Sequence, residues 1–280
     1  MSRRSLVVVT IVLGLLVGSV GIAYAITNGE PDGNDHPYVG LLVFDAWHYD
    51  ASGTWLYGPA WRCSGSLIAP DVVLTAGHCT DGALAARVWF DEVVEGNLEY
   101  PYGGSTSYEG IPYTYDGFCI GCGKGLPGFA TGDVGVVVLD EPVPTLVVDE
   151  YALLPGAGLV DTLRNKTGID FVGYGVQDMV HGGGPPYWTG EKVRLYAPSR
   201  LVSGKFVHSD EFMRLSLNPG KGKGGTCFGD SGGPDLLGGT DTVLAVNSYV
   251  TNYNCAGVGY SARVDIQEVL DWITGPHTSP

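Results

Sequence analysis

The chain has 280 residues, of which 44% are hydrophobic and 16% are charged, and it contains 44 glycines. This composition is too apolar for a disordered chain, and the length allows one large β domain or two smaller ones. The formal net charge of -15 disfavours binding to nucleic acids and to anionic membranes, because both are negatively charged.

Residues 1–25 have the features of an export signal. Two arginines near the start are followed by an almost unbroken apolar run over residues 6–22, and Ala23-Tyr24-Ala25 matches a small-residue cleavage site. An uncleaved membrane anchor is the alternative, since about 20 apolar residues can span a bilayer. The triplet favours cleavage, so we expect a secreted protein that begins at Ile26 and has no membrane contact after cleavage.

The rest of the chain shows strand-like segments separated by Gly/Pro-rich turns. The segments predicted as strands are 38–44, 86–90, 134–139, 171–175, 192–196, 213–217 and 243–249. Two aromatic and glycine-rich stretches, 45–61 and 100–129, are predicted as loops. An i, i+3, i+4, i+7 apolar pattern predicts an amphipathic helix over 265–273, which Gly275-Pro276 ends.

A cluster of acidic side chains lies between the strand segments of the first half. Its members are Asp91, Glu92, Glu95 and Glu99. Their oxygens could hold a calcium ion. A solvated acidic surface is the preferred interpretation, so we expect no cofactor and no metal, with structural calcium as the alternative.

Three separated segments carry reactive side chains. His78, in Thr-Ala-Gly-His-Cys, offers a base, and Asp133 heads a buried apolar run, where a carboxylate is costly unless its oxygens are paired. Ser231 lies in the glycine-rich segment 225–234, and a serine hydroxyl needs a base to become a good nucleophile. The glycines would let the Gly229 and Ser231 N–H groups approach a substrate oxygen as an oxyanion hole. Taken alone, this segment could also be a turn between strands.

These segments, in the order His, Asp, Ser, resemble the trypsin/chymotrypsin-like serine protease family. Residues 63–68 and Ser248-Tyr249 match as well, and the similarity spans roughly residues 26–274. The resemblance implies an all-β fold of two antiparallel six-stranded β-barrels with a C-terminal α-helix. Residues 26–146 would form the N-terminal barrel and residues 147–280 the C-terminal barrel, with the cleft between them.

The resemblance also implies the role of each reactive residue. Ser231 attacks, His78 transfers the proton, and Asp133 fixes the tautomer and orientation of His78. The amino group of Ile26 would pair with Asp230 and shape the oxyanion hole. Because Ala25 and not Arg or Lys precedes Ile26, we hypothesise that signal peptidase itself completes the enzyme.

An exported chain with six cysteines is expected to use disulfides. The resemblance implies the pairs Cys63 with Cys79 and Cys227 with Cys255. Cys119 and Cys122 remain, in a C-x-x-C arrangement that can also be a redox motif or half of a metal site. No βαβ pattern and no second C-x-x-C accompany them, so we expect a small structural disulfide.

Counting from Ser231, the resemblance places Gly225 at the floor of the specificity pocket. The other predicted substrate-binding residues are Thr226, Ser248, Tyr249 and Val250. Gly225 carries no charge, so we expect weak cleavage after Lys or Arg. Val250 would narrow the pocket, which favours apolar P1 side chains of small to medium size.

The sequence therefore predicts a secreted serine endopeptidase that acts through an acyl-enzyme. Its expected partners are protein or peptide substrates and protein inhibitors, and we expect a monomer. A non-catalytic binding module of the same fold is one alternative, although no member of the triad is missing. An esterase of the same fold is another.

Overall fold

The computed structural model describes residues 26–122, 130–180, 186–202, 211–218 and 224–277. The predicted export signal, residues 1–25, lies outside these ranges. Within them, no helix combines the length and the apolarity that crossing a membrane requires.

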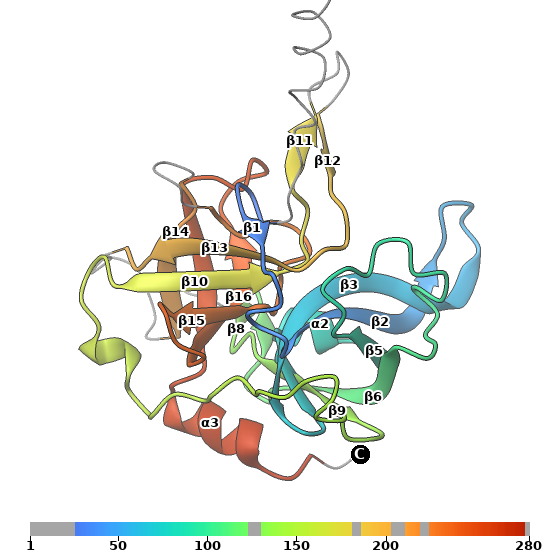
Figure 1. The fold of residues 1–280 in the computed structure, drawn as a ribbon. Coiled ribbons are helices and arrows are strands. Elements are labelled where there is room, and N and C mark those ends of the chain that lie inside the picture. The colour runs from blue at the N-terminus through green and yellow to red at the C-terminus, as the bar shows by residue number, and fades with distance from the viewer. Residues whose placement is uncertain (1–25, 123–129, 181–185, 203–210, 219–223, 278–280) are drawn as a thin grey trace, which may run out of the picture.

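The first half of the described chain forms a closed antiparallel barrel in the order β2-β3-β4-β9-β6-β5 (Figure 1). Its strands are β2 (Val39–Tyr49), β3 (Trp55–Ala69), β4 (Val72–Thr75), β5 (Ala85–Trp89), β6 (Ser107–Thr114) and β9 (Gly135–Leu139). Strand β9 pairs with β4 on one side and β6 on the other, as its continuous apolar sequence predicts.

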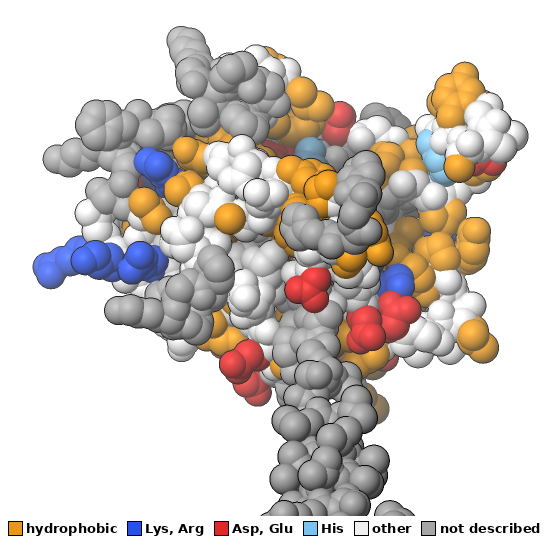
Figure 2. All heavy atoms as spheres, turned by 90° about the horizontal axis from the view of Figure 1, so that it is seen from above, with side chains coloured by type: hydrophobic (Ala, Val, Ile, Leu, Met, Phe, Trp, Pro, Cys, Tyr) orange, Lys and Arg blue, Asp and Glu red, His pale blue; other side chains and the backbone are white. Residues whose placement is uncertain are grey.

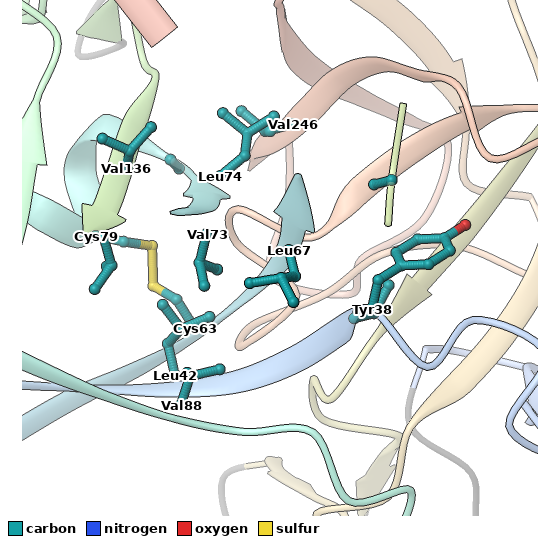
Figure 3. Packing of buried hydrophobic residues seen from close by; sticks show 14 of the residues in the cluster. Tyr38, Leu42, Cys63, Leu67, Val73, Leu74, Cys79, Val88, Val136 and Val246 are labelled. Atoms are coloured by element: carbon teal, nitrogen blue, oxygen red, sulfur yellow. A yellow bond between two sulfur atoms is a disulfide. The ribbon is translucent and has the colours of Figure 1, made fainter. Parts of the chain in front are cut away.

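The barrel interior is filled by aliphatic side chains. Leu42, Leu67, Val73 and Val88 are fully buried, and the Cys63–Cys79 disulfide packs among them (Figure 3). Each such side chain contributes about 1.5–3 kcal/mol through its removal from water. Val246, from the second half, belongs to the same apolar cluster, so the two halves pack against each other.

The second half forms a curled seven-stranded sheet in the order β1-β13-β10-β15-β16-β17-β14. Its strands are β1 (Glu30–Pro31), β10 (Gly168–Gly173), β13 (Leu195–Arg200), β14 (Phe212–Ser216), β15 (Pro234–Leu237), β16 (Val243–Val250) and β17 (Val258–Arg263). The two-half, mostly β fold is confirmed. The prediction of six strands here missed β1, which joins this sheet from the N-terminal segment by pairing with β13.

Smaller elements connect these sheets. They are α2 (Gly77–Thr80), the β7–β8 pair (Cys119–Ile120 and Ala130–Thr131), η1 (Val160–Thr162), the β11–β12 pair (Asp178–Val180 and Tyr187–Thr189) and α3 (Gln267–Thr274). The helix predicted near the C-terminus is confirmed as α3, with Val269 and Ile273 buried against the core. The predicted strand 192–196 overlaps only the start of β13.

Two loop predictions were wrong. Most of 45–61 belongs to the long β2–β3 hairpin, whose exposed aromatic residues form cross-strand pairs such as Trp47 with Tyr57. The stretch 100–129 contains β6, a full barrel strand. Its Gly110 resembles a loop residue in the sequence, yet a Cβ there would lie 2.4 Å from the Val138 carbonyl oxygen, so the close approach of β6 to β9 requires glycine.

Candidate active site

The short helix α2 brings His78 to the end of the barrel where β9 begins. The His78 N–H donates to Asp133 Oδ1 at 2.7 Å, and its ring Nδ1 lies 2.8 Å from Asp133 Oδ2. The Ser248 hydroxyl, from β16 of the other half, also donates to Oδ2. The Asp133 side chain is 2% exposed and that of His78 is 32% exposed, so a buried, fully bonded carboxylate holds an imidazole that faces solvent.

The electrostatics of this pair favour its charged form. Burial lowers the pKa of His78, but the hydrogen bond and the negative charge of Asp133 outweigh it, so that the net shift is upward. Burial raises the pKa of Asp133, but His78 and Ser248 reverse the shift and leave that pKa below its ordinary value. Asp133 therefore stabilises an imidazolium at His78, which is what a base that accepts a proton needs.

The loop that carries Ser231 docks onto β3 and onto the turn just before His78. The Ser231 carbonyl accepts the N–H of Ser64 at 2.8 Å, and the Ser64 hydroxyl donates to the Gly229 carbonyl at 3.0 Å. A Cβ on Gly232 would lie 2.7 Å from the Ala76 nitrogen, two residues before His78. Within the described chain no hydrogen bond joins the Ser231 hydroxyl to His78; such bonds are often long in enzymes without substrate.

Two N–H groups of the Ser231 loop are available as hydrogen-bond donors. The N–H groups of Asp230 and Gly232 are bonded to the carbonyls of Cys227 and Asn247. Those of Gly229 and Ser231 have no acceptor among the described residues. Gly229 has φ +94°, a conformation that glycine adopts without strain. The loop thus presents two free donors next to a serine.

A pocket of about 160 Å³ opens beside Ser231. Its lining residues are Thr226, Cys227, Phe228, Ser231, Asn247, Ser248, Tyr249 and Val250. Four predicted substrate-binding residues are among them. Gly225 is not: it lies behind the lining, where a Cβ would be 2.9 Å from Leu217.

Phe228 and Asn247 line this pocket without having been predicted as site residues, and Cys227 was predicted only as a disulfide partner. Asn247 interrupts the apolar sequence of β16, and that polar residue in a buried strand was a usable signal. Phe228 is a large aromatic residue in a glycine-rich loop, and 43% of it is exposed. The exposure of Phe228 beside the pocket is visible only in the structure, and the sequence offered only a large aromatic residue among glycines.

Asp230 is fully buried and accepts two backbone hydrogen bonds, from Gly175 at 2.8 Å and Cys227 at 2.9 Å. Burial raises its pKa to about 7, against smaller opposing effects of these donors and of Arg62. No lysine, arginine or histidine in the described ranges forms an ion pair with it. Ile26 is also fully buried.

The segment after Ile26 lies along the start of the Ser231 loop. Thr27 and Gly225 exchange both of their backbone hydrogen bonds, at 2.9 and 3.1 Å. The new chain end that cleavage before Ile26 would create therefore starts one residue from the loop that carries Asp230.

The six cysteines form the three expected pairs: Cys63 with Cys79, Cys119 with Cys122, and Cys227 with Cys255. The only possible metal-ligand cluster found in the described ranges, Cys63, His78 and Cys79, contains the first of these disulfides. In the acidic cluster, Glu95 forms an ion pair with Lys192 at 2.5 Å, and Glu99 accepts the N–H of Ser105 at 2.8 Å.

The two β halves, with a His–Asp pair and a glycine-rich serine loop where they meet, define a chymotrypsin-like serine hydrolase. The family model described as Trypsin matches residues 35–273, so the chain belongs to the trypsin family and is a serine-type endopeptidase by class. It is 27% identical over 236 residues to chymotrypsin-like elastase family member 3A of Homo sapiens, covering 80% of each chain. It is also 27% identical over 221 residues to brachyurin of Leptuca pugilator, covering 75% of this chain and 85% of that one.

Solved structures support the fold at lower identity. HL collagenase superposes with a TM-score of 0.62 at 19% identity, covering 90% of this chain and 96% of that one. Human heparin binding protein superposes with a TM-score of 0.59 at 17% identity, covering 91% and 100%. One of these names describes proteolysis and the other describes binding, so the fold alone does not decide between the two activities.

Proposed function

We propose that this protein is a secreted serine endopeptidase that cleaves peptide bonds through an acyl-enzyme. Ser231 is the nucleophile, His78 the base, Asp133 the group that orients His78, and the N–H groups of Gly229 and Ser231 the oxyanion donors. The observation that supports this most directly is the pair of hydrogen bonds from His78 to the buried Asp133 carboxylate, at 2.7 and 2.8 Å. A mere binding module would have no need of that costly arrangement.

The proposed P1 preference is for apolar side chains of small to medium size. Gly225 is uncharged, and in the described pocket lining no acidic side chain is present to pair with a P1 lysine or arginine. Val250 lies in the pocket wall, where its branched side chain takes up space. The Cys pairs are compatible with an oxidising compartment outside the cytosol.

Labelling by a fluorophosphonate, followed by P1 profiling of the secreted chain, tests this function. The wild-type chain should be labelled and should cleave peptides, and Ser231→Ala should lose labelling and lower kcat by roughly 10⁴- to 10⁶-fold. A folded wild-type chain that is neither labelled nor active on peptides would contradict the proposal. Cleavage of esters without cleavage of any peptide would assign an esterase instead.

A further inference from the structure

Three aromatic side chains from separate segments contact one another beside the Ser231 pocket, which one of them, Phe228, lines. Phe228 comes from the serine loop, Trp188 from β12, and Tyr253 from the loop after β16. The Phe228 and Tyr253 ring centroids are 5.6 Å apart, and Trp188 lies edge-on to them at 6.3 and 6.4 Å. We call these three residues the aromatic rim.

The aromatic rim is held in place by the backbone around it. Trp188 Nε1 donates to the Tyr253 carbonyl at 2.9 Å, and the Phe228 carbonyl accepts the N–H of Val176, two residues before β11. The Cys227–Cys255 disulfide joins the two loops next to Phe228 and near Tyr253. The rings are therefore pre-organised, and a ligand would not have to order them.

The rim is nevertheless open to solvent. Phe228 is 43% exposed and Tyr253 is 53% exposed, while Trp188 is half-buried. Strands β11 and β12 rise away from the body of the molecule on this side, and hydrophobic side chains are exposed across the same face (Figures 1 and 2). Aromatic rings that served only to stabilise this hairpin would contribute most to stability if they were fully buried. Their exposure beside a pocket therefore indicates a surface that a ligand covers.

We propose that the aromatic rim binds an aromatic or large aliphatic side chain of the substrate, close to the scissile bond but distinct from the residue in the pocket. Phe228 belongs to both the rim and the pocket lining, so one extended peptide can reach both. The Trp188 N–H is already used and Phe228 has no polar side-chain atom. Apart from the Tyr253 hydroxyl, the surface therefore offers ring faces and edges, which favour an apolar side chain. This inference rests on the proposed function and adds a second substrate contact to it.

The test uses peptides with alanine at P1 in which a single phenylalanine is moved through the three positions on either side. In the wild-type chain, phenylalanine at one of these positions should raise kcat/KM by roughly tenfold over alanine. Trp188→Ala should reduce that ratio to about two or less, while cleavage of the all-alanine peptide and fluorophosphonate labelling persist. Tyr187→Ala, which removes a 58% exposed ring from the same strand, is the matched control and should keep the wild-type ratio.

Two further variants keep the test decisive. Trp188→Phe should restore most of the preference, and Tyr253→Ala should weaken it as Trp188→Ala does. A ratio unchanged in both alanine variants, an equal loss in Tyr187→Ala, or no preference in the labelled wild-type chain would overturn the inference. Failure of the wild-type chain to label would instead contradict the proposed function itself.

Discussion

At the scale of single residues, Asp133 holds three hydrogen bonds at once, because its buried carboxylate accepts from the His78 N–H, the His78 ring and the Ser248 hydroxyl. Asp133→Asn keeps the shape but offers an amide N–H where the ring donates. The imidazole should then adopt the wrong tautomer, and kcat should fall roughly 10⁴-fold. Ser248→Ala is the control: it removes one donor and leaves the His78 bonds, so its loss should be far smaller. Equal losses would show that the tautomer is not what matters.

Asp235 offers a second residue-scale test. It is fully buried on β15, both carboxylate oxygens lack a well-formed hydrogen bond among the described residues, and burial raises its pKa well above the ordinary value despite a contact with Ser261. The unfolded chain releases this proton near pH 4 and the folded chain keeps it, so Asp235 lowers stability as pH rises above 4. The Tm of Asp235→Asn, measured relative to that of the wild type, should therefore increase as the pH rises from 4 to 7. A Tm difference that is constant with pH would contradict this.

At the scale of elements, the sequence predicts best where one strong pattern acts alone. The apolar run of β9, the periodic face of α3 and the cysteine pairs were all predicted correctly from local signals and from the family resemblance. Strand β6 was missed because its Gly110 serves the close packing of β6 against β9, which is a long-range property. The aromatic rim was missed for a similar reason, since its members come from separate segments of the chain.

Strand β16 supplies one wall of the pocket, from Asn247 to Val250. Val250→Gly removes a branched side chain from that wall and should admit larger P1 residues. We expect kcat/KM for P1 phenylalanine, relative to P1 alanine, to rise roughly tenfold, because the gain is the removal of a steric clash worth 1–3 kcal/mol. Profiling of both variants on matched peptides measures the ratio. An unchanged ratio would mean that Val250 does not limit the pocket.

At the scale of the whole molecule, the site depends on contact between the two halves. His78, on α2, and Asp133, just before β9, come from the barrel half, whereas Ser231, in the loop before β15, and Ser248, on β16, come from the other half. The Ser64 and Ser248 hydrogen bonds cross between them. Asp230, one residue from Ser231, has no ion-pair partner in the described ranges, and burial raises its pKa to about 7.

We infer that a free amino group at Ile26 supplies the missing cation and that cleavage before Ile26 thereby completes the enzyme. The expected pairing lowers the pKa of Asp230 and raises that of the amino group above its ordinary value near 8. A group whose pKa is raised on folding stabilises at low pH, and its contribution is lost as pH rises through the folded value. The free energy of unfolding of a chain that begins at Ile26 should thus be larger, by about 3 kcal/mol near pH 7, than that of a chain with one added N-terminal glycine.

The comparison of these two chains, by urea unfolding from pH 5 to 10 and by kcat/KM on one peptide, tests the pairing. The stability difference should grow from pH 5 to about 7, because the unpaired Asp230 of the longer chain has a raised pKa and loses its proton at a cost as pH rises. It should shrink above about pH 8 as the amino group of Ile26 loses its proton. The added glycine should also lower kcat/KM, because the oxyanion donors Gly229 and Ser231 flank Asp230 in the chain. Ile26→Val, which keeps the amino group and most of the buried side chain, should behave like wild type. Equal stability and activity of the two chains at all pH values would rule the pairing out.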